Sequence, residues 1–379
     1  MAHIWQVLGG STIGGGTYVV RRIVERLIHD GHRVTVVTSD GDTVTLFREI
    51  GAEIVDDIPI PRPVSPATDL ISLFRLASRM RASRCDLVHT HTSKAGVVGR
   101  FAAKLAGVPA TVHHVHGFGF NTRYSRSLEM RVFSAAERAA AAVSDALVFV
   151  NPEDLALARN LRIAGPQTQT RVIPNGVELP PLANASNRHS PGTSIGFLGR
   201  LAAQKGVDVL IDAVAHIADD KEVKVMLLGD GPLREKLEKQ AASSRRPDRF
   251  EFAGHVTNAG AWLSRLDMVV LPSRWEGHSI SVLECMAHGK AVITTDIEGN
   301  QQTVLDGENG LLVQPDNWDA LRMAMERLIE SPQLREQLGR AARATVAERF
   351  PAEAMINAVL LLYNDLGLTN NQAVIPCAA

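Results

Sequence analysis

The sequence has few of the residues that build disulfide-rich, zinc-bound or membrane-spanning proteins. Its three cysteines, Cys85, Cys285 and Cys377, are too far apart for a disulfide framework or for closely spaced metal ligands. No apolar run approaches the roughly 18 residues that span a bilayer, and no charged-then-apolar signal segment precedes the first predicted strand. We therefore expect a cytoplasmic protein with reduced thiols.

The net charge of the whole chain is also low, at -1, which argues against a nucleic-acid partner. The exception is Arg75–Arg138, where eleven basic residues stand against three acidic ones. Such a local field attracts phosphates or the anionic inner face of a cell membrane. The alternative is the solvated face of an arginine-rich helix, so peripheral membrane contact is one of two expectations here.

Hydrophobic periodicity alternates between strand and helix almost throughout, as in Ile4–Leu8 followed by Tyr18–Ile28. A Pro, Asn and Ser-rich stretch at Pro180–Ser194 interrupts the alternation, which then restarts. Two such runs predict an α/β protein with two Rossmann-like, doubly wound parallel-sheet domains. We expect an N-terminal domain over 1–180, a C-terminal domain over 190–349, and a helix over 350–367 that packs back towards the N-terminal domain.

A glycine-rich loop, GGSTIGGGT, follows the first predicted strand and includes Gly15 and Gly16. Glycines at such a position let the backbone approach a phosphate at a helix N-terminus. No frame of the loop gives G-x-G-x-x-G, and no lysine occupies the Walker position. Dehydrogenase and P-loop NTPase functions are therefore disfavoured, and the loop is either a ligand-facing loop or a tight turn.

Five histidines lie near the ends of two predicted strands, in the segments HTH and HHVH. Because strand side chains alternate, His89 and His91 share a face, as do His114 and His116. Without an acidic or cysteine partner at suitable spacing, we expect no metal site and instead a hydrogen-bonding histidine, with His116 favoured by the following Gly117. Asp40-Gly41-Asp42 matches a D-x-D metal motif, but in a polar turn it predicts no metal.

Beyond the linker, Arg200 and Lys205 lie between a strand and a helix, which is typical of an anion cradle. Such cations stabilise the charge that a diphosphate leaving group gains, so they can stand in for a metal. Glu276 lies in a later loop and Glu284 two turns into the helix after it. The first can reach a sugar hydroxyl, and the second can bind a ribose diol.

Taken in order, these motifs make the chain resemble the family-four retaining glycosyltransferases of the GT-B fold, in which two Rossmann-like domains flank a cleft. The matching segments cover nearly the whole chain: GGSTIGGGT, HTHTSKAG, HHVHGFGF, VIPNGV, FLGRLAAQKG, LLGDGP, FAGHV, PSRWEGHSISVLECMAHGKAVI and DGENGLLV. The HTHTSKAG and HGFGF segments resemble the subgroup that builds bacterial surface polysaccharides on lipid carriers. Departures from the usual pattern are His278, where many members have Phe or Leu, and Cys285, where Ala is usual.

The resemblance implies a role for each matching residue. Arg200 and Lys205 match the diphosphate binders, Glu276 the residue that holds the donor sugar, and Glu284 the residue that holds the ribose. His116 matches the histidine near the reaction centre. The remaining implied donor contacts are Gly15, Gly16, His255, Val256, Gly277, His278, Ser279 and Ile280, with His91 and Lys94 on the acceptor side.

We therefore predict a metal-independent hexosyltransferase (EC 2.4) without a cofactor, which moves a sugar from a nucleotide diphosphate, UDP more than GDP, to a glycan or lipid-linked acceptor. No obvious pair of carboxylates suits a covalent glycosyl-enzyme, so we expect the acceptor to attack from the leaving-group face. Two alternatives remain open, a sugar-nucleotide epimerase on the same fold and a non-catalytic sugar-nucleotide-binding module. A phosphorylase would need a pyridoxal phosphate lysine, and no good candidate occurs.

Overall fold

The computed structural model describes residues 1–10, 13–61, 63, 65–118, 127–165, 168–181, 192–256 and 258–368, with the main chain alone at 127–129. The chain divides into two compact units, which we call the N-unit (Met1–Pro174 with Glu353–Ala379) and the C-unit (Asn175–Ala352). The division after Pro174 lies ahead of the linker at 180–190 that composition suggested. It lies there because Val177 bonds to the end of the C-unit, where its N–H donates to the Phe350 carbonyl at 3.0 Å.

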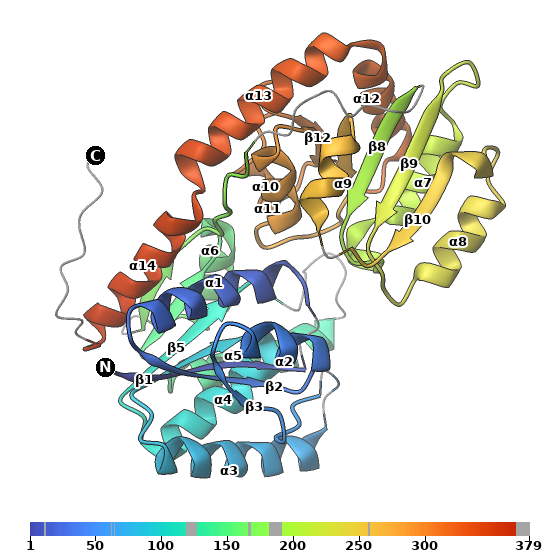
Figure 1. The fold of residues 1–379 in the computed structure, drawn as a ribbon. Coiled ribbons are helices and arrows are strands. Elements are labelled where there is room, and N and C mark those ends of the chain that lie inside the picture. The colour runs from blue at the N-terminus through green and yellow to red at the C-terminus, as the bar shows by residue number, and fades with distance from the viewer. Residues whose placement is uncertain are drawn as a thin grey trace. The chain divides into compact units, whose positions relative to one another are not determined.

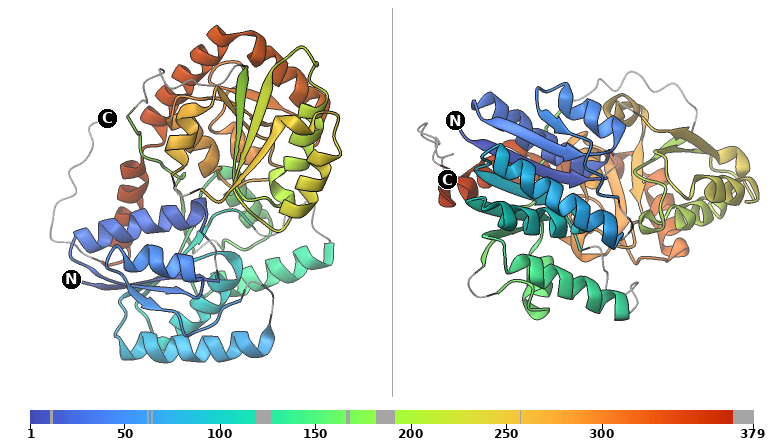
Figure 2. Two further views of the ribbon diagram at one scale, coloured as in Figure 1. Left: turned by 45° about the vertical axis from the view of Figure 1, so that its right-hand side comes forward. Right: turned by 90° about the horizontal axis from the view of Figure 1, so that it is seen from below.

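The N-unit is built on a parallel sheet covered by helices on both faces (Figures 1 and 2). Within its described residues the strand order is β3-β2-β1-β4-β5-β6-β7. The strands are β1 (His3–Gly9), β2 (Arg33–Thr38), β3 (Glu53–Val55), β4 (Leu87–His91), β5 (Ala110–Val115), β6 (Ala146–Phe149) and β7 (Gln169–Val172). The helices are α1 (Gly15–His29), α2 (Gly41–Arg48), α3 (Pro66–Ala82), α4 (Ser93–Ala106), α5 (Ser127–Ala141), α6 (Pro152–Asn160) and α14 (Ala352–Asp365).

The C-unit repeats this plan with the order β10-β9-β8-β11-β12-β13 among its described residues. Its strands are β8 (Thr193–Leu198), β9 (Val223–Leu228), β10 (Phe250–Gly254), β11 (Met268–Leu271), β12 (Ala291–Thr295) and β13 (Leu311–Val313). Its helices are η2 (Ala203–Lys205), α7 (Val207–Ala215), α8 (Arg234–Ala242), η3 (Pro247–Arg249), α9 (Ala259–Arg265), α10 (Ile280–Ala287), α11 (Glu298–Gln301), α12 (Trp318–Glu330) and α13 (Pro332–Arg349).

The central strands explain this architecture. All residues of β1, β4, β5 and β11 are buried, as expected for parallel strands that carry helices on both faces. Every described strand pair in both sheets is parallel. The register is continuous in pairs such as β4–β5, where Leu87 to His91 lie against Ala110 to His114. It shifts between Val7 and Gly9 in the β1–β2 pair and between Phe252 and Gly254 in the β9–β10 pair. The prediction of two doubly wound, Rossmann-like domains is therefore confirmed.

The C-terminal helix α14 belongs to the N-unit. Its Tyr363 is buried and accepts a hydrogen bond of 3.1 Å from the Gln6 amide on β1, and its hydroxyl lies 2.6 Å from Nδ1 of His89 on β4. Arg26 on α1 adds an ion pair of 3.1 Å with Glu353. The last helix therefore completes the unit that the first residues of the chain begin. No helix in the described part of the chain has the length and apolar character to cross a membrane.

Asp40 begins a helix where a polar turn was predicted. Its carboxylate accepts hydrogen bonds from the Thr43 N–H at 3.1 Å and the Thr43 hydroxyl at 2.8 Å, which caps α2. The sequence reading of a turn at Asp40-Gly41-Asp42 was therefore wrong, because it took an N-cap for a loop. The cap gives Asp40 a structural role.

The basic region is partly neutralised within the N-unit. Arg75 and Arg79 both pair with Asp57, at 3.2 and 2.6 Å. Further along the same region, Arg100 is fully buried against Glu137 at 2.5 Å. Several of these cations thus hold the fold together, and the net charge of the segment overstates the field that it presents to solvent.

Candidate functional site

The topology of each unit identifies where a ligand belongs. In open parallel sheets, ligands bind beyond the carboxyl ends of the strands at the point where the strand order reverses. That point lies between β1 and β4 in the N-unit and between β8 and β11 in the C-unit. The predicted site residues follow these four strands: the glycine loop after β1, His91 at the end of β4, Arg200 and Lys205 after β8, and Glu276 after β11.

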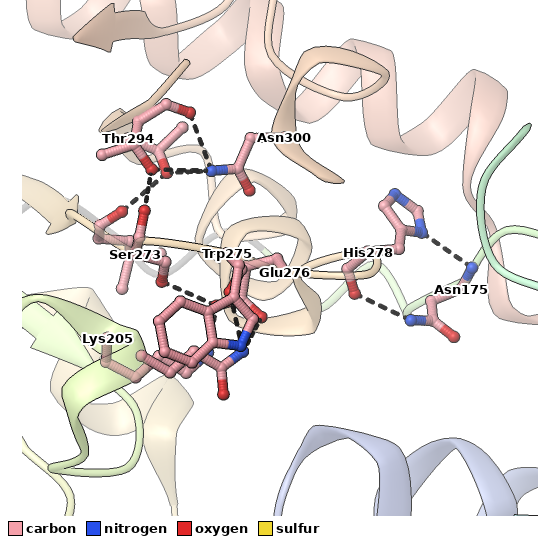
Figure 3. A network of polar contacts seen from close by, with 11 residues as sticks. Asn175, Lys205, Ser273, Trp275, Glu276, His278, Thr294 and Asn300 are labelled. Atoms are coloured by element: carbon pink, nitrogen blue, oxygen red, sulfur yellow. Dashed lines mark hydrogen bonds and ion pairs between the residues drawn. The ribbon is translucent and has the colours of Figure 1, made fainter. Parts of the chain in front are cut away.

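In the C-unit, the Glu276 carboxylate is the centre of a polar network (Figure 3). Lys205 Nζ forms an ion pair of 2.5 Å with Oε1 of Glu276, and the Ser273 hydroxyl donates to the same oxygen at 2.7 Å. The Gln204 amide donates to Oε2 at 3.2 Å and to the Trp275 carbonyl at 2.8 Å. The structure thus brings together the predicted Lys205 and Glu276, which lie 71 positions apart.

Several main-chain constraints hold this network in place. Gly206, directly after Lys205, has φ +63°, and a Cβ there would lie 2.1 Å from the Pro272 carbonyl oxygen, so only glycine fits. Arg274 pairs with Asp208 at 2.7 Å and with Asp316 at 2.6 Å. These hydrogen bonds to Asp208 and Asp316 raise the pKa of Arg274 further above its usual value. The loops after β8 and β11 are therefore fastened to each other on both sides of the Lys205–Glu276 pair.

His278 is buried and fully hydrogen bonded. Its Nδ1 accepts from the Asn175 N–H at 2.9 Å, and its carbonyl accepts from the Asn175 side-chain amide at 2.9 Å (Figure 3). Its Nε2 lies 2.8 Å from the Thr303 hydroxyl. Burial lowers the pKa of His278 to about 3, so the ring is neutral. Since the imidazole is used within the fold, what His278 offers a ligand is its main chain.

Glu284 differs from Glu276 in having an unpaired carboxylate. It lies on α10, partly buried, and no described residue donates a hydrogen bond to its side chain. Burial raises the pKa of Glu284 to about 7. A carboxylate left in this state is well suited to accept hydrogen bonds from a ligand hydroxyl pair, which would favour its ionised form.

The other predicted donor contacts lie around the same strand ends. Arg200 is exposed in the loop after β8, and His255 is exposed after β10 while Val256 packs against the core. Gly277, Ser279 and Ile280 form the N-terminus of α10, with Ser279 as its N-cap residue. Main-chain N–H groups at such a terminus, close to two cations, are suited to bind a phosphate.

In the N-unit, Gly15 and Gly16 are the first residues of α1, with Gly14 as N-cap. A Cβ on Gly16 would meet nothing within 4 Å, so the space beside it is open. This first turn follows β1 directly at the switch point of the sheet. That this loop faces a ligand stays a prediction.

The four histidines at the ends of β4 and β5 lie together as predicted from their alternation. His91 Nδ1 is 3.0 Å from His116 Nε2, and His91 Nε2 is 2.8 Å from the Gln6 side-chain oxygen. The rings of His114 and His116 stack with centroids 4.2 Å apart. Burial lowers the pKa of His116 to about 4 and that of His91 well below its usual value. These rings are neutral hydrogen-bonding groups at pH 7.

His91 and Lys94, predicted on the acceptor side, both have internal partners. His91 is buried, and Lys94 Nζ pairs with Asp69 at 2.6 Å. Sequence reasoning missed Gln6 and Tyr363, which hold the histidine group from β1 and α14. The local sequence around Gln6 or Tyr363 does not indicate this role, because the two residues lie 357 positions apart in the sequence.

Two family models match the chain and divide it between them. Residues 14–176 match the glycosyl transferase 4-like domain, and residues 183–345 match the glycosyl transferases group 1 domain. The first match lies in the N-unit apart from its last two residues. The second lies wholly within the C-unit.

Two curated relatives are similar to this chain over most of its length. A UDP-Gal:alpha-D-GlcNAc-diphosphoundecaprenol alpha-1,3-galactosyltransferase of Escherichia coli is 29% identical over 80% of this chain and 82% of its own length. The capsular polysaccharide biosynthesis glycosyltransferase CapM of Staphylococcus aureus is 24% identical over 93% of this chain and 95% of its own.

Among solved structures, Anabaena HepE in complex with UDP and glucose superposes with a TM-score of 0.80 at 20% identity, over 96% of this chain and all of that one. Sucrose-phosphate synthase of Thermosynechococcus elongatus gives 0.81 at 23% identity, over 97% and 99%. The structural matches establish the GT-B fold, and the two family models establish the family. The chain therefore belongs to the GT4-like glycosyltransferases of the GT-B fold.

Proposed function

We propose that this glycosyltransferase is a hexosyltransferase that moves a sugar from a nucleotide diphosphate to a glycan or lipid-linked acceptor in bacterial surface polysaccharide biosynthesis. The observation that carries the proposal is the Lys205–Glu276 pair at the switch point of the C-unit, fixed by Ser273 and Gln204. The relatives named for galactosyl transfer and capsule biosynthesis support the class of acceptor.

The C-unit binds the donor in this proposal. The diphosphate lies against Arg200, Lys205 and the N-terminus of α10 at Gly277–Ile280, and Glu276 accepts hydrogen bonds from the sugar hydroxyls. Glu284 accepts from the ribose diol, and the backbone of His255 and Val256 contacts the base. The complexes of HepE with UDP and with UDP-glucose support a UDP-sugar over GDP-mannose.

The transfer proceeds with retention and without a metal. The acceptor hydroxyl oxygen bonds to the anomeric carbon on the face from which the phosphate oxygen departs, and that oxygen takes the acceptor's proton. Lys205 and Arg200 stabilise the negative charge that develops on the diphosphate, and this stabilisation is greater in the transition state than in the ground state. Glu276, held by Lys205 and Ser273, positions the sugar and forms no covalent bond with it.

The N-unit provides the acceptor side. His116 contacts the reacting sugar, His91 lies beside His116 on the acceptor side, and Gly15 and Gly16 approach the phosphate. Lys94 acts near the acceptor, where its pairing with Asp69 fixes its position. Contact with an anionic membrane, through those cations of Arg75–Arg138 that have no ion-pair partner among the described residues, brings a lipid-linked acceptor within reach.

The test is sugar transfer from UDP-glucose and UDP-galactose to a diphospholipid acceptor, measured in excess EDTA. Glu276→Gln should lower kcat by about 10²–10³-fold, as expected for loss of a group that acts at the reacting sugar. Glu330→Gln is the matched control, since its exposed carboxylate pairs only with Lys221 at 3.1 Å among the residues described. Full activity in the Glu276 variant would refute the site.

Two further measurements separate the alternatives. Incubation with the sugar nucleotide alone should leave the sugar unchanged, whereas an epimerase would convert it without acceptor. A non-catalytic module would bind the donor and release no nucleotide with acceptor present. UDP should raise the unfolding temperature more than GDP or ADP at equal concentration, because a ligand stabilises the fold in proportion to ln(1 + [L]/Kd).

A further inference from the structure

The inference concerns three histidines of the N-unit, His89 and His91 on β4 and His114 on β5, which we call the histidine triad. All three are buried, and one ring nitrogen from each lies within 4.8 Å of the others. We propose that the histidine triad binds a late first-row transition-metal ion of the zinc class. The proposal is independent of the transfer chemistry and assigns this site a structural role.

The triad is a product of strand register. His91 lies opposite His114 in the β4–β5 pair, and His89 lies on the same face of β4 two residues earlier. Zinc–nitrogen bonds of about 2.05 Å at tetrahedral angles place ligand nitrogens about 3.3 Å apart. The nitrogens of the triad lie within 4.8 Å of one another, so they must approach by up to about 1.5 Å to surround one ion.

Unused ring nitrogens point to a ligand. Among the described residues, Nε2 of His89 and both ring nitrogens of His114 are buried without a hydrogen-bond partner. Folded proteins seldom leave several such atoms together, because each loses its hydration and gains nothing in return.

The residues behind the triad provide the outer contacts that metal-binding histidines have. A ligating histidine donates its second N–H to an oxygen, which fixes the tautomer and the ring orientation. The Gln6 side-chain oxygen lies 2.8 Å from Nε2 of His91, and the Tyr363 hydroxyl lies 2.6 Å from Nδ1 of His89. These contacts leave Nε2 of His89 and Nδ1 of His91 to face the ion, and His91 exchanges its contact with His116 for it.

The donor set selects the ion. Three neutral imidazoles suit zinc, cobalt, nickel or copper, whereas magnesium, calcium and manganese prefer oxygen ligands. No carboxylate or thiolate of the described residues belongs to the group. Three histidines leave a fourth coordination position for water or a small anion, and an anion there offsets part of the ion's charge. The bound ion would join β4 to β5 and, through Gln6 and Tyr363, to β1 and α14.

The experiment uses the full chain without a histidine tag, freed of metal by chelation. Cobalt(II) should give a visible ligand-field spectrum that saturates at one equivalent per chain, and zinc(II) should abolish the spectrum and raise the unfolding temperature. His114→Leu should weaken binding at least 100-fold. Tyr363→Phe, which keeps all three ligands, should weaken it about 10–100-fold.

His29→Gln is the control for adventitious surface binding, because the His29 side chain is 84% exposed. Equal loss of binding in this control and in His114→Leu would refute the site, as would a wild-type chain with no cobalt spectrum and no zinc retained after gel filtration. If His114→Leu does not fold, the cobalt spectrum of the wild type and the metal affinity of Tyr363→Phe still test the site. None of these readouts uses a sugar nucleotide, so failure of the triad and failure of the proposed transferase function are separate results.

Discussion

The N-unit and the C-unit share a strand order about their switch points but place different chemistry there. In the C-unit, the Glu276 carboxylate lies within a set of donors, with Lys205 at 2.5 Å. In the N-unit the corresponding strand ends carry neutral, stacked imidazoles, some of whose nitrogens have no partner among the described residues. The cations Lys205 and Arg200 suit an anionic diphosphate, whereas buried neutral groups suit packing, hydroxyl recognition or a metal. The same fold thus supports two kinds of site.

The largest effect is expected at Arg100, which forms a fully buried ion pair with Glu137 in the N-unit. Arg100→Met leaves the Glu137 charge buried and should cost about 3–5 kcal/mol in the free energy of unfolding. Urea denaturation of the purified chain measures it. Arg100→Met with Glu137→Leu should recover most of the loss, and Arg79→Met, at an exposed pair, should cost under about 1 kcal/mol. A single variant as stable as the wild type would show that burial does not enforce pairing there.

The next test concerns His278, the neutral imidazole of the C-unit. His278→Phe leaves the buried Asn175 N–H and Thr303 hydroxyl without their partner. Each such group costs about 1–3 kcal/mol, so the unfolding temperature and the donor affinity should both fall. His278→Gln should restore part of the loss because its amide can both accept and donate, whereas His255→Phe, at an exposed position, should change stability little. Equal stability of all three variants would contradict the structural role.

A pH series tests whether ionisation of Glu284 destabilises the fold. Its folded pKa, raised by burial to about 7, exceeds the usual 4.5, so the unfolded chain loses the proton first and stability falls as pH rises between these values. Without ligand, Glu284→Gln should gain about 2 kcal/mol relative to wild type between pH 5 and pH 8, after allowance for solvent screening at its partly exposed carboxylate. Calorimetry at each pH measures the difference. Stability curves for wild type and Glu284→Gln that stay parallel across this pH range would refute the prediction. Glu298→Gln is the control for removal of a carboxylate.

The smallest effect is expected at Asp40. Asp40→Ala removes the N-cap of α2 and should cost about 1 kcal/mol. Transfer activity should stay unchanged, with and without EDTA, since the carboxylate is a cap in the N-unit. Asp42→Ala, at the exposed neighbouring carboxylate, should affect neither property. A large loss of activity in the Asp40 variant would restore the D-x-D metal motif that the fold argues against.

Secondary structure was predictable where elements are long or clearly bounded. The strand predicted at Ile4–Leu8 is β1 at His3–Gly9, and the helix predicted at Tyr18–Ile28 is α1 at Gly15–His29. The strands β3 and β13 were missed because three residues are too few to show a period. Three α-helices were missed. The N-caps of α2 and α6, Asp40 and Asn151, resemble turn residues until the hydrogen bonds to their side chains are seen, and α11 has only four residues.

The candidate site was predictable to the extent that it is local. Lys205 and Glu276 stand in recognisable segments, and the alternation of His89 with His91 already places both on one face. The sequence did not reveal the partners of these residues. Gln6, Tyr363 and Asn175 reach the site from distant segments through packing of whole elements, and no local pattern carries that information.

The placement of Tyr363 has a consequence for biosynthesis. The N-unit is assembled from Met1–Pro174 and from Glu353 onward, and Tyr363 meets Gln6 and His89 across most of the chain. During translation the first segment leaves the ribosome long before α14 is synthesised. The face of the sheet around Gln6 therefore lacks α14 while the C-unit is being synthesised. Domains commonly fold in the order of synthesis, and exposed apolar surface invites aggregation. In this chain the first unit to begin folding is the last to finish.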